Sequence, residues 1–309
     1  MEGRGMPVER SQPRHEAEGT AMKTLRTVLA QAEHQGVAVG HFNISDLAAL
    51  KGIFAAAHDI GVPALVGVSE GERAFMGVRQ VAALVASIRD EYEYPIFLNA
   101  DHTRSLANAE AAARAGFDEV LFDGSALAYD ENVAETRRAV EAVKSIDPSI
   151  LVEGELGHIG TASEILEAAP EGLGPLTTPE EARQFVEATK IDVLAPAVGN
   201  MHGLLRSMVR GETAKRLNIE RIAEIKDAAR IFLTLHGGSG TNDDDLRRAI
   251  KAGMTIVHIN TELRLAWRRG LEAALAKETE EVTPYKILPG AMRAVQEVVR
   301  ARLQLFNGA

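Results

Sequence analysis

The chain has 309 residues, which exceeds a typical single domain but suits one large α/β barrel, since such barrels run from about 200 to over 400 residues. With 46% hydrophobic and 25% charged residues, its composition excludes a mainly disordered, collagenous or coiled-coil protein. The formal net charge of −10 argues against general affinity for nucleic acids or anionic membranes. Because the chain has no cysteine, thiolate chemistry is excluded, and any metal site must use histidines and carboxylates.

The first 22 residues are rich in Arg, Glu, Gly and Pro and show no apolar periodicity, so we predict a disordered N-terminal extension. Residues 23–309 contain no linker and are predicted to form one domain. No run of about 18 uncharged apolar residues occurs, and we therefore expect a soluble, cytoplasmic protein without a membrane span.

Eight short runs rich in apolar and β-branched residues predict strands at Val37–Ile44, Ala64–Ser69, Pro95–Ala100, Glu119–Phe122, Ile150–Glu155, Val193–Val198, Ile231–Leu235 and Thr255–Ile259. Amphipathic stretches after them predict helices at Leu47–Ile60, Arg79–Glu91, Ser105–Ala115, Val133–Ile146, Pro179–Thr189, Ile219–Ala229, Asp243–Ala252 and Glu262–Lys277. Thr178 and Pro179 ahead of two glutamates form a helix-start signal. Eight such units predict a closed TIM (β/α)8 barrel of the α/β class with a C-terminal helical arm.

Polar residues follow the predicted strands, at the end where barrel enzymes build their sites. A lone histidine there is most simply a core or surface residue. His102, His202 and His236, however, follow three different strands. We expect them to meet over the barrel mouth and to bind Zn²⁺ or a similar borderline metal, leaving one coordination position open.

Asp123 and Glu155 lie on the intervening rims of the predicted barrel. Their carboxylate oxygens suit an alternate position of the ion or a second ion. The simpler interpretation is a helix cap for Asp123 and a solvated loop acid for Glu155, and the sequence leaves both open.

A glycine-rich segment, His236-Gly237-Gly238-Ser239-Gly240, follows the seventh predicted strand. Taken alone, such a segment is more often a flexible turn. Barrels often hold phosphate at the loops after strands seven and eight, where backbone amides approach the anion closely. We therefore predict a phosphate site here, completed by Asn260 and Thr261 on the following loop.

Nine stretches have a specific order and spacing: VGHFNISDLAAL, ADH, GFDEVLFDGS, YDENVAET, VEGELG, TPEEARQFVE, DVLAPAVGNMHG, LHGGSG and INTE. Through them the chain from about residue 23 to 307 resembles the class II, metal-dependent ketose-bisphosphate aldolases, which include fructose-bisphosphate and tagatose-bisphosphate aldolases. No lysine follows a predicted strand, so the Schiff-base route of the other aldolase class has little support.

The resemblance implies a function for many of these residues. It implies that His102, His202 and His236 hold a catalytic Zn²⁺, and that Asp101 is the acid/base on the C4 oxygen of the substrate. Asp123 and Glu155 would hold the alternate position or a second divalent or monovalent cation. The phosphate of dihydroxyacetone phosphate would lie on Gly203, Gly237, Gly238, Ser239, Asn260 and Thr261. Asn43 and Ser69 would contact the aldehyde side.

Two departures from the family pattern affect proton transfer and the oxygens at C2 and C3. The loop after Glu155 lacks the usual acidic pair, and Glu164 is the nearest substitute for the second acid/base. His258 replaces the asparagine that binds the enediolate. We expect it to donate a hydrogen bond to the C2 oxygen, with a place among the metal ligands as the alternative.

Two further departures concern the substrate and the backbone. Thr103 stands where a glycine usually follows Asp101-His102. The Asp-Pro-Arg whose arginine reaches the distal phosphate across a dimer is replaced by Thr283-Pro284-Tyr285-Lys286, so Lys286 or Arg206 is expected to contact that phosphate.

The resemblance implies cleavage of a ketose phosphate, with fructose 1,6-bisphosphate as the leading substrate, by a homodimer or homotetramer in glycolysis and gluconeogenesis. Two alternatives stay open. One is the same mechanism on tagatose bisphosphate or a deoxy-sugar phosphate, and the other is a noncatalytic protein that binds sugar phosphate and metal.

Overall fold

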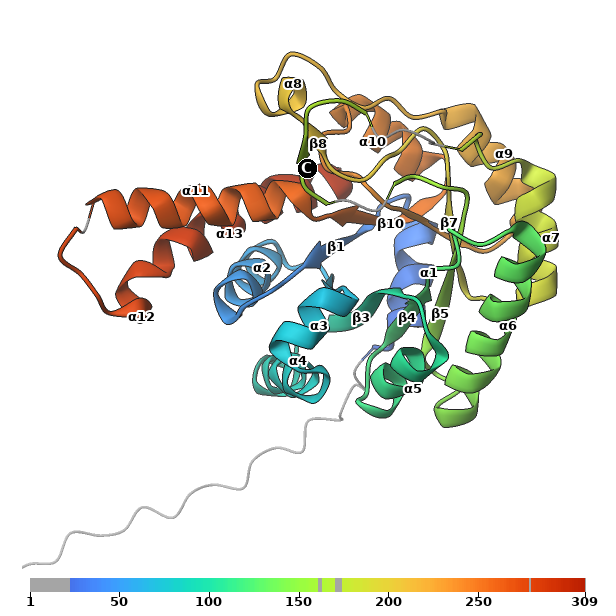
Figure 1. Ribbon diagram of the computed structural model, residues 1–309, viewed down its shortest axis with the longest axis horizontal. Helices are drawn as coiled ribbons and strands as arrows, with labels where there is room; N and C mark the ends of the chain where they lie inside the picture. The colour runs from blue at the N-terminus through green and yellow to red at the C-terminus, as the bar shows by residue number, and fades with distance from the viewer. Residues whose placement is uncertain (1–22, 161–162, 170–173, 278, 309) are drawn as a thin grey trace, which may run out of the picture.

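Eight parallel strands close into a barrel in this computed structural model (Figure 1). The structure describes residues 23–160, 163–169, 174–277 and 279–308, so the predicted extension 1–22 lies outside it. Around the barrel the strands are β1 (Val39–Asn43), β10 (Met254–Ile259), β9 (Phe232–Leu235), β7 (Val193–Pro196), β5 (Leu151–Leu156), β4 (Glu119–Phe122), β3 (Ile96–Thr103) and β2 (Ala64–Val68). The TIM barrel predicted from the sequence is confirmed.

Helices cover the outside of the barrel, and each strand of the barrel is followed by at least one. They are α2 (Leu47–Ile60), α3 (Glu70–Met76), α4 (Val78–Tyr92), α5 (Leu106–Arg114), α6 (Tyr129–Ile146), α7 (Pro179–Thr189), α9 (Ile219–Ala229), α10 (Asp243–Lys251) and α11 (Thr261–Lys277). Between strands and helices lies the main apolar core, whose largest members include Phe117 and Phe185.

The N-terminal end of the barrel is closed by a helix that the sequence analysis did not predict, α1 (Leu25–Gln35). Thr24 caps its start and Gly36 ends it with a φ of 65°. Its residues Leu25, Val28, Leu29 and Ala32 pack on inward side chains at the bottom of the strands, among them Leu65, Phe97, Leu151, Val193 and Ile256. The site is therefore confined to the opposite end.

Inside the barrel, a layer of polar side chains lies above the apolar layer that α1 covers. Its members are two residues further along their strands. Side chains alternate across a strand, so the residues two positions after Val39, Phe97 and Leu151 also point inward. These are His41, Asn99 and Glu153, and all three are fully buried. This polar layer forms the floor of the site above it.

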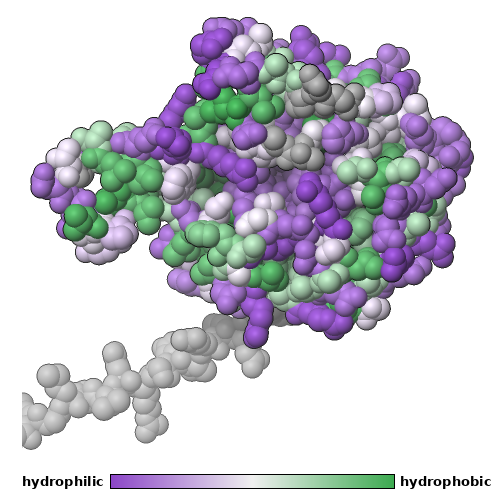
Figure 2. Space-filling view, viewed as in Figure 1, coloured by the Kyte–Doolittle hydropathy of each residue, from purple (hydrophilic) through white to green (hydrophobic). Residues whose placement is uncertain are grey.

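A helical arm extends from one side of the barrel, as the sequence predicted (Figure 1). It consists of α11, α12 (Pro284–Ile287) and α13 (Pro289–Phe306). α11 and α13 pack so closely at Gly270 that an added Cβ there would lie 2.6 Å from the Gly290 oxygen, so the contact requires glycine. Exposed apolar side chains gather on the arm, including Leu275, Val282 and Tyr285 (Figure 2).

Two short loops at the opposite end from α1 pair with each other. Within the loop after β5, β6 (Ile165–Leu166) runs parallel to β8 (Leu204–Leu205), which lies after β7 and leads into α8 (Arg206–Val209). Among the described helices, none is long and apolar enough to cross a membrane.

Replacing Thr178 by Ala should lower the free energy of unfolding by about 1 kcal/mol, because its side chain caps the start of α7. Thr178 Oγ1 accepts a hydrogen bond from the Glu181 amide, and Glu181 in turn accepts from the Thr178 amide at 2.9 Å. Urea unfolding measures the effect. Thr178→Ser keeps the cap and is the control; equal loss in both variants would contradict the assignment.

Candidate active site

A pocket lies at the carboxyl ends of the strands, with about 290 Å³ of space between its atoms, part of it open to solvent. Loops and strand ends that are far apart in the sequence contribute its walls. It is lined by Asn43, Asp101, His102, Ser163, His202, Gly203, His236, Gly237, Ser239, His258, Asn260 and Thr261. Most of the residues predicted to bind metal and phosphate therefore share one enclosure.

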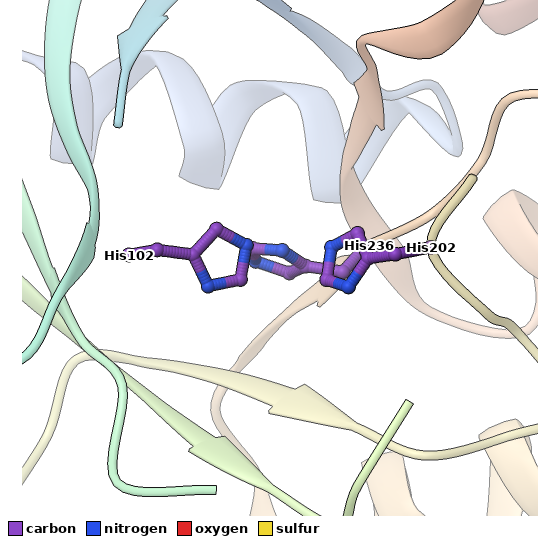
Figure 3. Close-up of side chains that lie close together, drawn as sticks. All are labelled: His102, His202 and His236. Carbon is purple, nitrogen blue, oxygen red and sulfur yellow. The ribbon is translucent and has the colours of Figure 1, made fainter. Parts of the chain in front are cut away.

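Three histidines from β3, the loop after β7 and the end of β9 point toward one another across this cavity (Figure 3). The ring centroid of His102 lies 4.9 Å from that of His202 and 5.0 Å from that of His236, and the rings meet edge to face. One nitrogen of each imidazole lies within 4.8 Å of the others. This is the arrangement expected of three protein ligands to one metal ion.

His236 and His202 each have one ring nitrogen held by the protein and the other directed into the cavity. His236 Nε2 lies 2.7 Å from Glu153 Oε1, while its buried Nδ1 has no hydrogen-bond partner. His202 Nδ1 lies 2.6 Å from the Gly160 oxygen, which leaves Nε2 free. Metal-binding histidines characteristically donate their second N–H to a carboxylate or carbonyl in this way.

Burial keeps these two imidazoles neutral. It lowers the pKa of His202 and of His236 to about 3, with His102 adding to the effect in both cases. Because only the neutral imidazole can donate a nitrogen lone pair to a metal, the pocket holds both rings in the metal-binding form across the physiological pH range. Burial lowers the pKa of His102 as well, but Asp101, Asp123 and Glu155 outweigh burial and raise it to about 10, so His102 would release its proton when it binds a metal. With that proton released, the donor set fits a divalent metal.

The residues predicted to form the alternate ion position, Asp123 and Glu155, lie beside His102. Its Nδ1 lies 3.0 Å from Asp123 Oδ2 and 3.4 Å from Glu155 Oε2, so the three form a second group of potential ligands. Burial raises the pKa of Glu155, and repulsion by Asp123 adds to this. Glu155 is a buried strand residue and not a solvated loop acid.

Asp101 has one oxygen held and one free. Its Oδ2 accepts a hydrogen bond from Asn43 Nδ2 at 2.9 Å, while the buried Oδ1 has no hydrogen-bond partner. Burial raises its pKa, but the neighbouring His102, His41 and His236 and the Asn43 amide outweigh burial and hold the pKa below the usual range. Asp101 is thus an ionised carboxylate facing the cavity.

His258 stacks face to face on His41, with ring centroids 3.5 Å apart and an interplanar angle of 5°. Its Nδ1 lies 3.7 Å from Asp101 Oδ1, and its Nε2 has no hydrogen-bond partner. His41 fills the space beside Gly67, where an added Cβ would lie only 2.1 Å from the His41 ring. The sequence analysis gave His41 no role, although it sets the plane of the His258 ring.

The predicted phosphate loops line the same cavity. Gly237 has a φ of 63°, and a Cβ there would lie 2.2 Å from the Met201 oxygen, so only glycine fits. Ser239 Oγ accepts hydrogen bonds from the Asn260 and Glu262 amides. The Gly238 amide donates to the His258 oxygen at 3.0 Å, so this amide is already engaged within the protein.

Seven predicted residues are not part of the cavity lining: Asp123, Glu155, Ser69 and Gly238 adjoin it, and the other three are Glu164, Arg206 and Lys286. Glu164 is exposed, and its neighbour Ser163 lines the cavity instead. Arg206 lies on α8 and pairs with Glu167. Lys286 lies on α12, at the far end of the arm, and pairs with Glu281 at 2.7 Å.

A second hollow adjoins the cavity on the side of Asp101 and contains Ser69. Arg104 and Arg264 line it and are about half exposed. Arg264 donates to Glu72 Oε1 at 2.7 Å and to the Ser163 oxygen at 3.0 Å. The sequence analysis missed both arginines, because neither belongs to a motif of the strand ends.

Glu153, which holds His236 Nε2, is a residue that the sequence analysis did not single out. It stands two residues before Glu155 on β5, a spacing that places both side chains on the inner face of the barrel. That spacing is the one signal that could have identified it.

Three histidines that could hold a metal at the carboxyl ends of a (β/α)8 barrel are typical of a metal-dependent enzyme. The family model of class-II fructose-bisphosphate aldolases matches residues 23–309. A probable fructose-bisphosphate aldolase from Bacillus subtilis is 32% identical over 289 residues, covering 93% of this chain and 98% of its own. The chain belongs to the class-II fructose-bisphosphate aldolase family, and it is a lyase of a metal-dependent class.

Solved structures agree with this assignment. The YdjI aldolase from Escherichia coli K12 superposes with a TM-score of 0.77 at 27% identity, covering 91% of this chain and 96% of that one. A putative fructose-1,6-bisphosphate aldolase from Coccidioides immitis has a TM-score of 0.77 at 25% identity, with 91% and 95% covered.

Replacing Glu153 by Ala should weaken metal affinity by about 10- to 100-fold, because His236 loses the carboxylate that orients its ring. Competition with a chromophoric chelator measures the affinity. Glu119→Ala is the matched control, since Glu119 is an equally buried barrel carboxyl that bonds Asn99 and touches no histidine of the site. Equal losses in both variants would contradict a specific role of Glu153.

Proposed function

We propose that this protein is a Zn²⁺-dependent aldolase that cleaves a ketose 1-phosphate or 1,6-bisphosphate, with fructose 1,6-bisphosphate as the leading substrate. The products are dihydroxyacetone phosphate and an aldehyde, which is glyceraldehyde 3-phosphate for the leading substrate. The observation that carries the proposal is the convergence of three imidazole nitrogens, all within 4.8 Å of one another, beside the unpaired oxygen of Asp101, within a cavity lined by glycine-rich loops.

His102, His202 and His236 would hold the metal. Three imidazoles with an open fourth position suit Zn²⁺, and the same donors accept other borderline divalent ions. His202 and His236 are already neutral, and His102 would release its proton on binding the metal. When bound, the metal acts as a Lewis acid that polarises the carbonyl at C2. Asp123 and Glu155 would take the ion in an alternate position or bind a second cation, since both approach His102.

Asp101 would act as the general base in the cleavage direction. Its free Oδ1 takes the proton from the C4 hydroxyl as the bond between C3 and C4 breaks, and the electron pair of that bond passes to C3. Asn43 holds the other oxygen in place. His258, aligned by His41, would donate a hydrogen bond to the C2 oxygen as negative charge develops there. Glu164 remains the prediction for the second acid/base.

The phosphate of the dihydroxyacetone half would bind between the two glycine-rich loops. Gly203, Gly237 and Ser239 approach it from one side, and Asn260 and Thr261 at the start of α11 from the other. The positive end of the α11 dipole favours an anion here, which supports this assignment, while the Asn260 and Glu262 amides hold Ser239 Oγ in place. Gly238 would support the loop through its bond to the strand below rather than bind phosphate directly.

The aldehyde half of the substrate would extend toward Ser69, into the hollow lined by Arg104 and Arg264. Two cationic side chains beside Asp101 favour an anionic group at the far end of the substrate. Lys286 is a second candidate for this contact only from the arm of another subunit in a homodimer or homotetramer, and Arg206 only if it leaves Glu167. We expect the protein to act in cytoplasmic sugar-phosphate metabolism, in glycolysis and gluconeogenesis.

Two other functions are distinguishable from this one. The same mechanism on tagatose bisphosphate or a deoxy-sugar phosphate is the first, and its motive is that Thr283-Pro284-Tyr285-Lys286 replaces Asp-Pro-Arg. Catalytic efficiencies on epimeric substrates separate it from the leading proposal. A noncatalytic protein that binds sugar phosphate would bind dihydroxyacetone phosphate without exchanging its C3 proton.

Removal of the metal with a chelator should abolish cleavage of fructose 1,6-bisphosphate, and added Zn²⁺ should restore it, because without the metal no Lewis acid polarises the C2 carbonyl. An assay coupled to reduction of dihydroxyacetone phosphate measures the rate. Activity that resists the chelator, or no cleavage of any ketose phosphate, would overturn the proposed function.

Replacing Asp101 by Ala should lower kcat by about 10²- to 10⁴-fold, the range for loss of a general base. The metal content should stay unchanged, because the three histidines are intact. Steady-state kinetics and metal analysis of the same sample give both values. Unchanged activity would remove Asp101 from this role.

Replacing Arg264 by Ala should raise KM for fructose 1,6-bisphosphate by about tenfold or more, the cost of one charge-assisted hydrogen bond, and leave KM for fructose 1-phosphate nearly unchanged. Arg268→Ala, on the exposed face of the same helix, is the control. The same selective effect from Lys286→Ala instead would assign the distal contact to the arm.

A further inference from the structure

Lys215 is a buried lysine in the loop between α8 and α9, with 4% of its surface exposed. Its ammonium nitrogen lies within hydrogen-bond distance of four backbone carbonyl oxygens, which belong to Met201, Gly203, Gly237 and Ser239, at 2.7, 2.7, 2.9 and 2.6 Å, and its three N–H groups are shared among them. We call these four oxygens the carbonyl cage. They come from the loops after β7 and β9, which are separate in the sequence and meet at this one cation.

The residues that form the carbonyl cage also form the proposed site. Met201 and Gly203 flank the metal ligand His202, and Gly237 follows the ligand His236. Gly203, Gly237 and Ser239 line the cavity. A change in the cage would therefore move two metal ligands and the phosphate loops together.

The opposite ends of the same four peptide units are also bonded. Because a trans peptide directs its C=O and N–H to opposite sides, each carbonyl in the cage fixes the direction of the next N–H. In the loop after β7, the His202 amide donates to the Ile159 oxygen and the Leu204 amide to the Glu164 oxygen, both at 2.9 Å. In the loop after β9, the Gly238 amide donates to the His258 oxygen at 3.0 Å, and the Gly240 amide donates to the Glu262 carboxylate at 2.7 Å. Lys215 thus connects loops that follow four strands.

Two backbone hydrogen bonds of Lys215 fix the residue from which the ammonium group extends. The Lys215 amide donates to the Gly240 oxygen at 2.8 Å, and the Lys215 oxygen accepts from the Asn242 amide at 3.1 Å. Burial lowers the pKa of Lys215 to about 7, and Glu262 opposes this shift. The four oxygens around Nζ are all acceptors, so the cage favours the ammonium form, which supplies three donors and a positive charge and has no lone pair facing an oxygen.

We propose that the Lys215 ammonium is an internal monovalent cation that positions His202, His236 and the phosphate loops of this enzyme. Without it, four carbonyl oxygens would face one another with no donor, at the cost that buried unsatisfied acceptors carry. A group of carbonyl oxygens is also the coordination that proteins offer to K⁺. A Lys215→Ala variant, which vacates the cage, should therefore bind K⁺ or NH₄⁺ in place of the side chain.

The first experiment measures stability and does not depend on catalysis. The thermal midpoint of Zn²⁺-loaded Lys215→Ala should rise with added KCl or NH₄Cl by several degrees more than with choline chloride at equal ionic strength. The wild-type midpoint should respond to the three salts alike, because its cage is filled. Lys226→Ala is the matched control, since Lys226 donates to the Ile231 oxygen at the opposite end of the barrel.

The second experiment measures function and rests on the proposed aldolase activity. Lys215→Ala in choline chloride should bind inorganic phosphate about tenfold more weakly and show a raised KM, and K⁺ or NH₄⁺ should reverse both effects. Lys215→Met fills the cage with an uncharged chain of similar length and should not be rescued. If the alanine variant does not fold, Lys215→Gln takes its place in both experiments, because its side-chain amide still donates to the carbonyl cage but carries no charge.

The outcomes separate the two proposals. If the wild type cleaves no ketose phosphate, the proposed function fails, while salt-dependent stability of Lys215→Ala still decides the role of Lys215. If the folded, Zn²⁺-loaded alanine variant responds no more to K⁺ and NH₄⁺ than to choline, or if Lys215→Met is rescued equally, the internal-cation role is overturned.

Discussion

The closed register of eight parallel strands is the constraint on which the rest of this structure depends. It aligns His41 with His258 across β1 and β10, and Glu153 with Val193 across β5 and β7. Because inward side chains repeat every second residue, one fixed register places an apolar layer at the bottom, a polar layer above it and the site at the mouth. The helix α1 closes the bottom, so ligands approach from the mouth alone.

Burial removes the polar groups at the mouth from water, which costs free energy. One hydrogen bond to each group offsets part of this cost and leaves a second atom of the group without a partner. His236, His202 and Asp101 each have one polar atom bonded within the protein and another directed into the cavity. The bonded atom fixes orientation, and the free atom retains the capacity to bind a ligand. This division produces neutral imidazoles beside an ionised carboxylate within one small enclosure.

The motifs at the strand ends predicted the barrel and the three histidines, because local patterns report which residues end a strand and the barrel rule gathers those ends. The same reasoning failed for residues that act from elsewhere. Lys215 lies in an irregular loop with no motif, and Arg264 lies one turn into a helix. Their contacts join segments far apart in the sequence, and no periodicity reports such contacts.

The sequence by itself determined the fold class, the family and the metal-binding residue types, since hydrophobic periodicity, residue order and the absence of cysteine require no coordinates. Only the tertiary structure decided which nitrogen of each histidine is free, that Glu153 orients His236, and that Lys215 fills a cage of four carbonyls. The physical reason is that orientation and hydrogen-bond partnership are properties of distances between strands and loops, which exist only after the barrel has closed.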